Sequence, residues 1–235
     1  MKLSLTTLPL ALVFLASTAF AGPVADFETG FRDTYASYRM ALFATNSGDP
    51  DKSTRAIGDF DSRWRDLVSQ NGSAPPPHYA DDPAWEETLA GVSGAIAKAR
   101  QMADDGQLAQ SHDVLEHIRG AIGALHSRNG IETFSDRMNA YHAQMEQVIG
   151  MPAQDEAARQ LVREQAAVLA YLVDDMLETP PPEAAGNAEF DTLAQAVKAS
   201  VAAVQTAARN GDAEAIKAAT SGLKVPYSKL FLKFG

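Results

Sequence analysis

Two histidine–glutamate pairs are the residues whose types and spacing point most directly to chemistry. His112 precedes Glu116 by four positions, and His142 precedes Glu146 by the same number. Side chains four residues apart lie on one face of an α-helix, about one turn from each other. Imidazole together with carboxylate suits iron, zinc or manganese. We therefore expect these four side chains to bind a transition metal.

The predicted site depends on how the two helices that carry these pairs are arranged. If the first helix ends near Arg128, the second begins near Ser135 and the two run antiparallel, both glutamates lie at the same height, about 18 and 16 Å from the connection. On a helical wheel both pairs also lie at one edge of this hairpin, with Arg119 between them. We expect Arg119 to hold a carboxylate of the site.

Storage, delivery or sensing of the metal fits the chain better than catalysis. The sequence has no Gly-x-Ser-x-Gly nucleophile motif, no His-Glu-x-x-His and no phosphate-binding glycine loop. The same pairs are also typical of an ordinary solvated helix edge, where Arg119 forms a surface ion pair with Glu116. Both interpretations stay open at this point.

Sulfur ligands offer another metal site on the second of these helices. Met138, His142 and Met145 share one helix face, and thioether with imidazole suits copper. The two methionines also fit the apolar core, where methionine commonly fills gaps. A weaker alternative is a non-covalent haem with Met40 as an axial ligand.

The remaining histidines are expected to have ordinary roles. His78 lies in a proline-rich loop, and His117 lies opposite the apolar stripe of its helix, so both are predicted to be solvated. His126 comes near a helix end, where we expect it to contact the last carbonyl groups.

Composition and the first residues indicate the class of protein. The 235 residues include 20 Lys or Arg, 30 Asp or Glu and no Cys, with a net charge of -10. This charge argues against a nucleic-acid binder, and the missing cysteines exclude disulfides, thiolate metal sites and covalent haem. Lys2, the apolar segment Leu8–Ala16 and the small residues of Ala19–Ala21 resemble a signal peptide. We expect cleavage before Gly22 and export to the periplasm.

From Val24 onward the apolar residues recur at helical spacing, which predicts an all-α protein. Turn residues divide the chain into about eight helices, and no segment alternates like a strand of useful length. We expect an antiparallel helical bundle, either one bundle or two four-helix bundles built from hairpins, with a possible boundary near 180–187. The interruptions are Gly48–Pro50, Asn71–Pro77, Asp105–Gly106, Asn129–Gly130, Pro152, Pro180–Pro182 and Gly211–Asp212.

The last hairpin resembles a known family. The turn Asn210–Asp212, followed by a helix that closes with Val225–Phe231, is similar to the final hairpin of cytochrome c′ and cytochrome b562 bundles. The resemblance implies a periplasmic four-helix bundle. The Cys-x-x-Cys-His motif that attaches haem in cytochrome c′ is absent, so a covalent haem is not implied.

A protein-interaction module without metal is the rival function. Its best feature is the segment Tyr227–Phe234, which is basic and aromatic in an otherwise acidic chain. Burial of Phe231 and Phe234 would indicate packing against the bundle. Exposure of both would indicate docking to a periplasmic or membrane partner.

Overall fold

The computed structural model describes residues 22–235, and this part of the chain is all-α, as expected. The predicted signal peptide lies outside the described residues. None of the described helices is both long and apolar enough to cross a membrane. The helices are α1 (Pro23–Asn46), α2 (Pro50–Asn71), α3 (Trp85–Asp104), α4 (Leu108–Arg128), α5 (Phe134–Ile149), α6 (Glu156–Glu178), α7 (Ala188–Asn210), α8 (Ala213–Ser221) and α9 (Lys224–Phe234).

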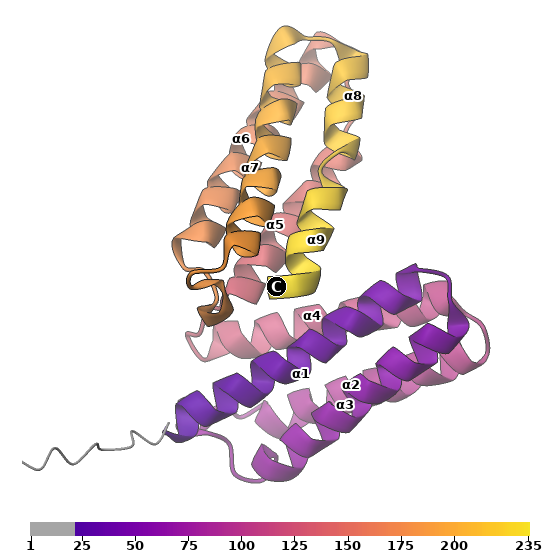
Figure 1. Ribbon diagram of the computed structural model, residues 1–235, viewed down its shortest axis with the longest axis vertical. Coiled ribbons are helices and arrows are strands. Elements are labelled where there is room, and N and C mark those ends of the chain that lie inside the picture. The colour runs from indigo at the N-terminus through magenta and orange to yellow at the C-terminus, as the bar shows by residue number, and fades with distance from the viewer. Residues whose placement is uncertain (1–21) are drawn as a thin grey trace, which may run out of the picture.

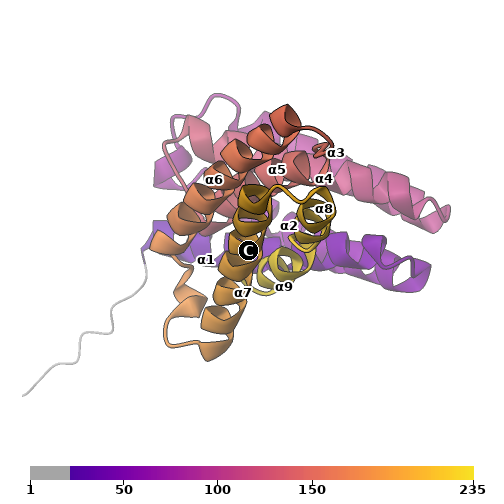
Figure 2. The same ribbon diagram turned by 90° about the horizontal axis from the view of Figure 1, so that it is seen from above.

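These helices form two bundles that lie at a steep angle to each other (Figures 1 and 2). In the first bundle, α1 packs on α2, α2 on α3 and α3 on α4, and α1 closes the group against α4. In the second, α5, α6 and α7 are joined by α8 and α9, which together fill the place of a fourth helix. The predicted all-α helical bundle is therefore confirmed, and of the two arrangements that the sequence left open the structure has two bundles.

The first bundle is organised around an aromatic stripe on α1. Phe27, Phe31, Tyr35 and Tyr38 recur at spacings of three and four, and all four are buried. Neighbouring rings along this stripe are in contact, with centroids 5.0–6.4 Å apart. The helix ends before Gly48, whose φ of 75° is a left-handed conformation that glycine adopts without strain. Thus sequence periodicity and turn chemistry account for α1 locally.

The predicted antiparallel hairpin of the fourth and fifth helices is wrong. After Arg128 the chain turns away, so α4 stays beside α1 and α3 while α5 runs beside α6 in the other bundle. Each helix buries its apolar stripe within its own bundle, which leaves no stripe for packing α4 along α5. The passage between bundles is at 129–133, whereas 180–187 joins α6 to α7 inside the second bundle.

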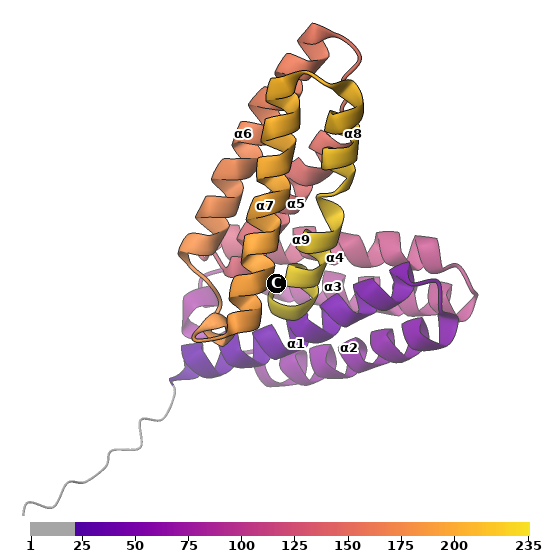
Figure 3. The ribbon, with the colours of Figure 1, turned by 45° about the horizontal axis from the view of Figure 1, so that its top comes forward.

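The last predicted helix is broken into α8 and α9. Pro226 has no N–H, so it cannot donate to the carbonyl of Gly222, and a continuous helix is interrupted there. The break lets α9 pack against α1 as well as α5 and α7 (Figure 3). Phe231 and Phe234 are each only 7% exposed, so the C-terminal segment is packed rather than free. The feature that favoured docking is therefore part of the core.

Candidate functional site at the junction of the two bundles

A line of polar contacts crosses from the first bundle toward the second. It begins where Thr45 Oγ1 of α1 lies 3.0 Å from His112 Nδ1 of α4. His112 Nε2 lies 3.6 Å from Glu116 Oε1, and Arg119 Nη2 donates to the same oxygen at 3.2 Å. The first predicted pair is therefore held next to Arg119, as expected.

Arg119 continues the line into the second bundle. Its Nη1 donates to His142 Nδ1 of α5 over 2.7 Å. His142 Nε2 lies 3.6 Å from Glu146 Oε1, which in turn forms an ion pair of 3.1 Å with Lys224 Nζ of α9. The four predicted ligands and Arg119 thus lie in one series, which we call the junction line.

The Arg119 guanidinium lies between the two His–Glu pairs, at the centre of the predicted metal site. Arginine has only donors, so His142 Nδ1 accepts the hydrogen bond and the neutral ring carries its proton on Nε2. Binding a metal through either nitrogen requires Arg119 to leave, because the occupied lone pair must be freed or the proton moved. In residues 22–235, no group of three or more His, Cys, Asp or Glu side chains is placed to hold one ion. The metal site stays a prediction.

Burial and charge also act on His142. Its ring stacks on Tyr227 with centroids 5.2 Å apart, and Arg119 is only 11% exposed. Burial lowers the pKa of His142, and the neighbouring Arg119 charge lowers it further. Glu116 and Glu146 act in the opposite direction, but the net pKa is below the usual histidine value. His142 is therefore held neutral at the junction.

A second histidine site lies close by and is missing from the sequence predictions. His126 at the end of α4 is only 2% exposed, and its Nδ1 lies 2.7 Å from Asp136 Oδ2 of α5. The same oxygen accepts from the N–H and the hydroxyl of Thr133, in the capping box that begins α5. The expected contact of His126 with helix-end carbonyls is wrong, because its Nδ1 is hydrogen-bonded to the Asp136 carboxylate of the next helix.

Among residues 22–235, His126 Nε2 has no hydrogen-bond partner. Asp136 acts as an acceptor when it is ionised, so His126 donates from Nδ1 and the neutral ring keeps its lone pair on Nε2. This nitrogen is buried without a protein partner. A buried polar atom without a partner costs about 1–3 kcal/mol, which makes it a candidate for binding a group from outside the chain.

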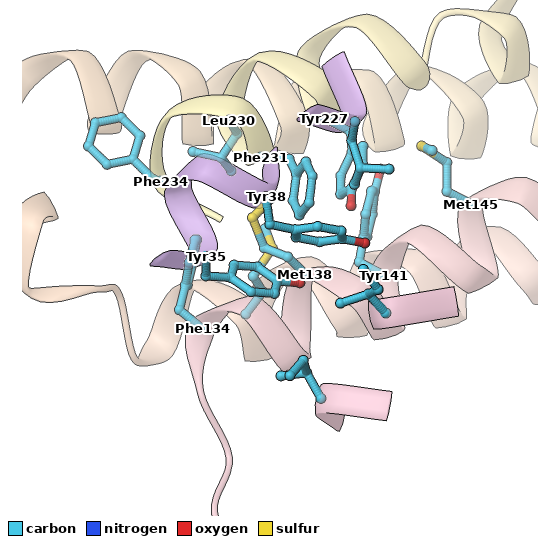
Figure 4. Close-up of a cluster of buried hydrophobic side chains, with 14 of the residues drawn as sticks. Tyr35, Tyr38, Phe134, Met138, Tyr141, Met145, Tyr227, Leu230, Phe231 and Phe234 are labelled. Atoms are coloured by element: carbon cyan, nitrogen blue, oxygen red, sulfur yellow. The ribbon is translucent and has the colours of Figure 1, made fainter. Parts of the chain in front are cut away.

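A pocket of about 340 Å³ lies between the two bundles, and His126 is one of its lining residues. We call it the junction pocket. One side comes from α1, and the others come from the ends of α4 and α5, the segment 179–183 and the last residues of the chain. Phe134 of α5 and Tyr35 of α1, both labelled in Figure 4, are lining residues of this pocket. The apolar part of its wall includes Phe31, Tyr35, Ala36, Ile122, Phe134, Phe234 and the prolines 180–182.

No protein-family model, curated protein or solved structure matches this chain. The resemblance to cytochrome c′ and b562 bundles therefore stays a prediction from the last hairpin. The function has to be argued from the chain's own residues and their geometry.

The other predicted ligands are distributed over core and surface. Met138 and Met145 are fully buried among apolar side chains, so a copper site with His142 would draw its sulfur ligands from the core. Met40 is 49% exposed and does not project into a bundle, which disagrees with a role as an axial haem ligand. We expected His78 to be solvated, but its Nε2 lies 2.7 Å from Glu28 Oε1.

Proposed function

We propose that this protein binds a small organic molecule in the junction pocket. The observation that carries the proposal is a pocket of about 340 Å³ between two bundles, lined by aromatic rings and one histidine with a spare lone pair. Binding sites for small molecules are typically concave, mostly apolar and about 300–1,000 Å³ in volume, and they favour domain interfaces. A binding protein fits these features without any catalytic motif.

The test is to fill the pocket. Ala36 of α1 lines it, so Ala36→Trp places an indole in the binding volume. We expect this variant to bind a neutral apolar dye such as Nile red about tenfold more weakly than the wild type, or not at all. The matched control is Ala203→Trp, which adds the same ring at an exposed position of α7. Equal dye binding by both variants would contradict the proposal.

Transition-metal binding is the second candidate function. It is favoured by the junction line, which connects both His–Glu pairs across the two bundles. The ligands would be His112, Glu116, His142 and Glu146, with Arg119 turned aside when the ion binds. Iron, zinc or manganese suits these groups, and copper suits the alternative set with Met138 and Met145.

Elemental analysis tests the metal proposal. The protein is purified without an affinity tag and then incubated separately with each of the four metals. Near-stoichiometric metal should be lost in a variant with His142→Ala and Glu146→Ala, and kept in His117→Ala, where the changed histidine is exposed and outside the junction line. A folded wild type that takes up none of these metals would contradict it. Export to the periplasm and a protein partner there also stay predictions.

A further inference from the structure

We infer that the ligand of the junction pocket is a neutral phenol, whose hydroxyl group donates a hydrogen bond to Nε2 of His126. This inference rests on the proposed function, because it concerns the chemistry of the molecule that the same pocket binds. Three observations carry it. They are the hydrogen bonding of His126, the charges of the pocket wall and the aromatic rings in it.

The first observation is the hydrogen bonding of His126. Asp136 Oδ2 accepts a hydrogen bond from His126 Nδ1–H and two more from the N–H and the hydroxyl of Thr133. In its neutral form the imidazole therefore keeps its lone pair on Nε2, which can accept a hydrogen bond from a donor group of a ligand. Seven side chains in the described part of the chain have a buried polar atom without a hydrogen-bond partner, and His126 is the one among them that lines the junction pocket.

The second observation is that the donors of the wall's cations are already used, by carboxylates for Arg32 and Lys233 and by main-chain oxygens for Arg39. Arg32 Nε lies 3.3 Å from Glu183 Oε1, and Lys233 forms an ion pair with Glu189. Arg39 donates to the main-chain oxygens of Leu232, Lys233 and Gly235. An anionic ligand would have to displace these partners, so a neutral ligand is favoured.

The acids of the wall lead to the same conclusion for a cationic ligand. Glu28 is bonded to His78 and Glu132 to Arg137, while Glu183 is the partner of Arg32. The remaining acid, Asp33, is exposed to solvent. No cluster of unpaired carboxylates is therefore formed by the lining residues.

The third observation is the aromatic character of the wall. Phe31 and Tyr35 of α1, Phe134 of α5 and Phe234 of α9 all line the pocket. Aromatic rings pack favourably on each other in offset or edge-to-face geometry. A flat ring with one hydroxyl group matches a wall of rings with one spare acceptor better than an alkyl chain does.

Access to Nε2 requires one local movement. The nitrogen is covered, and the ring of Phe31 contacts the His126 ring edge-on with centroids 5.5 Å apart. Both rings line the pocket, so a turn of the Phe31 ring is the movement that we expect to open a path from the pocket to Nε2. The hydroxyl then replaces a missing hydrogen bond rather than breaking an existing one.

The experiment compares two molecules of the same shape. 4-Ethylphenol can donate a hydrogen bond, whereas 4-ethylanisole has the same ring with a methyl ether and cannot. Binding is measured by isothermal titration calorimetry in the presence of EDTA. We expect the wild type to bind the phenol about tenfold more tightly, because only the phenol satisfies the buried nitrogen. His126→Phe keeps a ring at this position and should bind the two molecules equally.

A second readout does not depend on any variant. The ¹⁵N resonance of His126 Nε2 should move when the phenol is added and stay unchanged with the ether. Equal affinity of the wild type for both molecules, or an unchanged resonance, would overturn the inference. If Ala36→Trp still abolishes binding of both, the proposed function stands without it. If neither molecule binds and Ala36→Trp leaves dye binding unchanged, both proposals fail.

Discussion

His126 and His142 lie at the same junction of the two bundles, yet they are prepared for opposite roles. His142 Nδ1 faces a guanidinium, which can only donate, so its lone pair is used. His126 Nδ1 faces a carboxylate, which accepts a hydrogen bond, so the lone pair of Nε2 stays available for a ligand. The comparison shows that the charge of a single neighbour decides what each histidine can still bind.

The largest expected effect comes from removing the carboxylate that defines the His126 site. Asp136→Ala removes the N3 carboxylate of the α5 capping box and the partner of a buried imidazole, so we expect a loss of about 2–4 kcal/mol in the free energy of unfolding. Urea denaturation measures this loss. The control is Asp212→Ala, which removes only an exposed cap of α8 and should cost about 1 kcal/mol. Equal losses would show that the contact with His126 contributes nothing.

A medium effect on the free energy of unfolding is expected when the pH is lowered, because His142 then gains a proton. Burial and Arg119 lower the pKa of His142 in the folded state, so the folded protein prefers the neutral ring. This preference adds to the free energy of unfolding. The contribution is fully present above the pKa of the unfolded histidine, about 6.5, and is lost as the pH falls below that pKa. We expect the wild type to lose about 1 kcal/mol more than His142→Phe between pH 7 and pH 5.

Urea titrations of both proteins across this pH range measure that difference. His142→Phe keeps the ring that stacks on Tyr227 and removes only the titrating nitrogen atoms. The charged groups around the ring are Arg119, Glu116, Glu146 and Lys224, and they are the same in both proteins. Parallel curves for the two proteins would contradict the prediction.

The smallest effect is expected at the rim of the junction pocket. The ion pair of Arg32 and Glu183 is substantially exposed, so Glu183→Gln should change the free energy of unfolding by no more than about 0.5 kcal/mol. Thermal or urea denaturation at low and high salt checks this. A loss above about 1 kcal/mol would mean that this pair, rather than the buried contacts, holds the two bundles together.

The helices could be predicted from sequence because their signals are local. Turns such as Gly48–Pro50 and the capping box of Thr133 with Asp136 depend only on nearby residues, and both are present in the structure. The partner of each helix could not be predicted in this way. An apolar stripe indicates that a helix face is buried, but it does not indicate which other helix covers that face.

The two histidine sites illustrate this difference. The wheel argument correctly placed Arg119 between the His–Glu pairs, although the helices cross between bundles instead of forming a hairpin. The His126 site was missed, even though a signal was present. His126 follows Ile122 by four residues, so it lies on the buried stripe of α4, and a buried imidazole needs a partner.

The order in which helices pair has a consequence for folding kinetics. In the first bundle every helix pairs with its neighbour along the chain, and proteins dominated by such short-range contacts fold rapidly. The contact of α9 with α1 joins segments almost a whole chain apart, so closing it is entropically slow. We expect two kinetic phases, with the first bundle collapsing early. The junction pocket would form only in the second phase, when α9 packs against the aromatic residues of α1 in the folded first bundle.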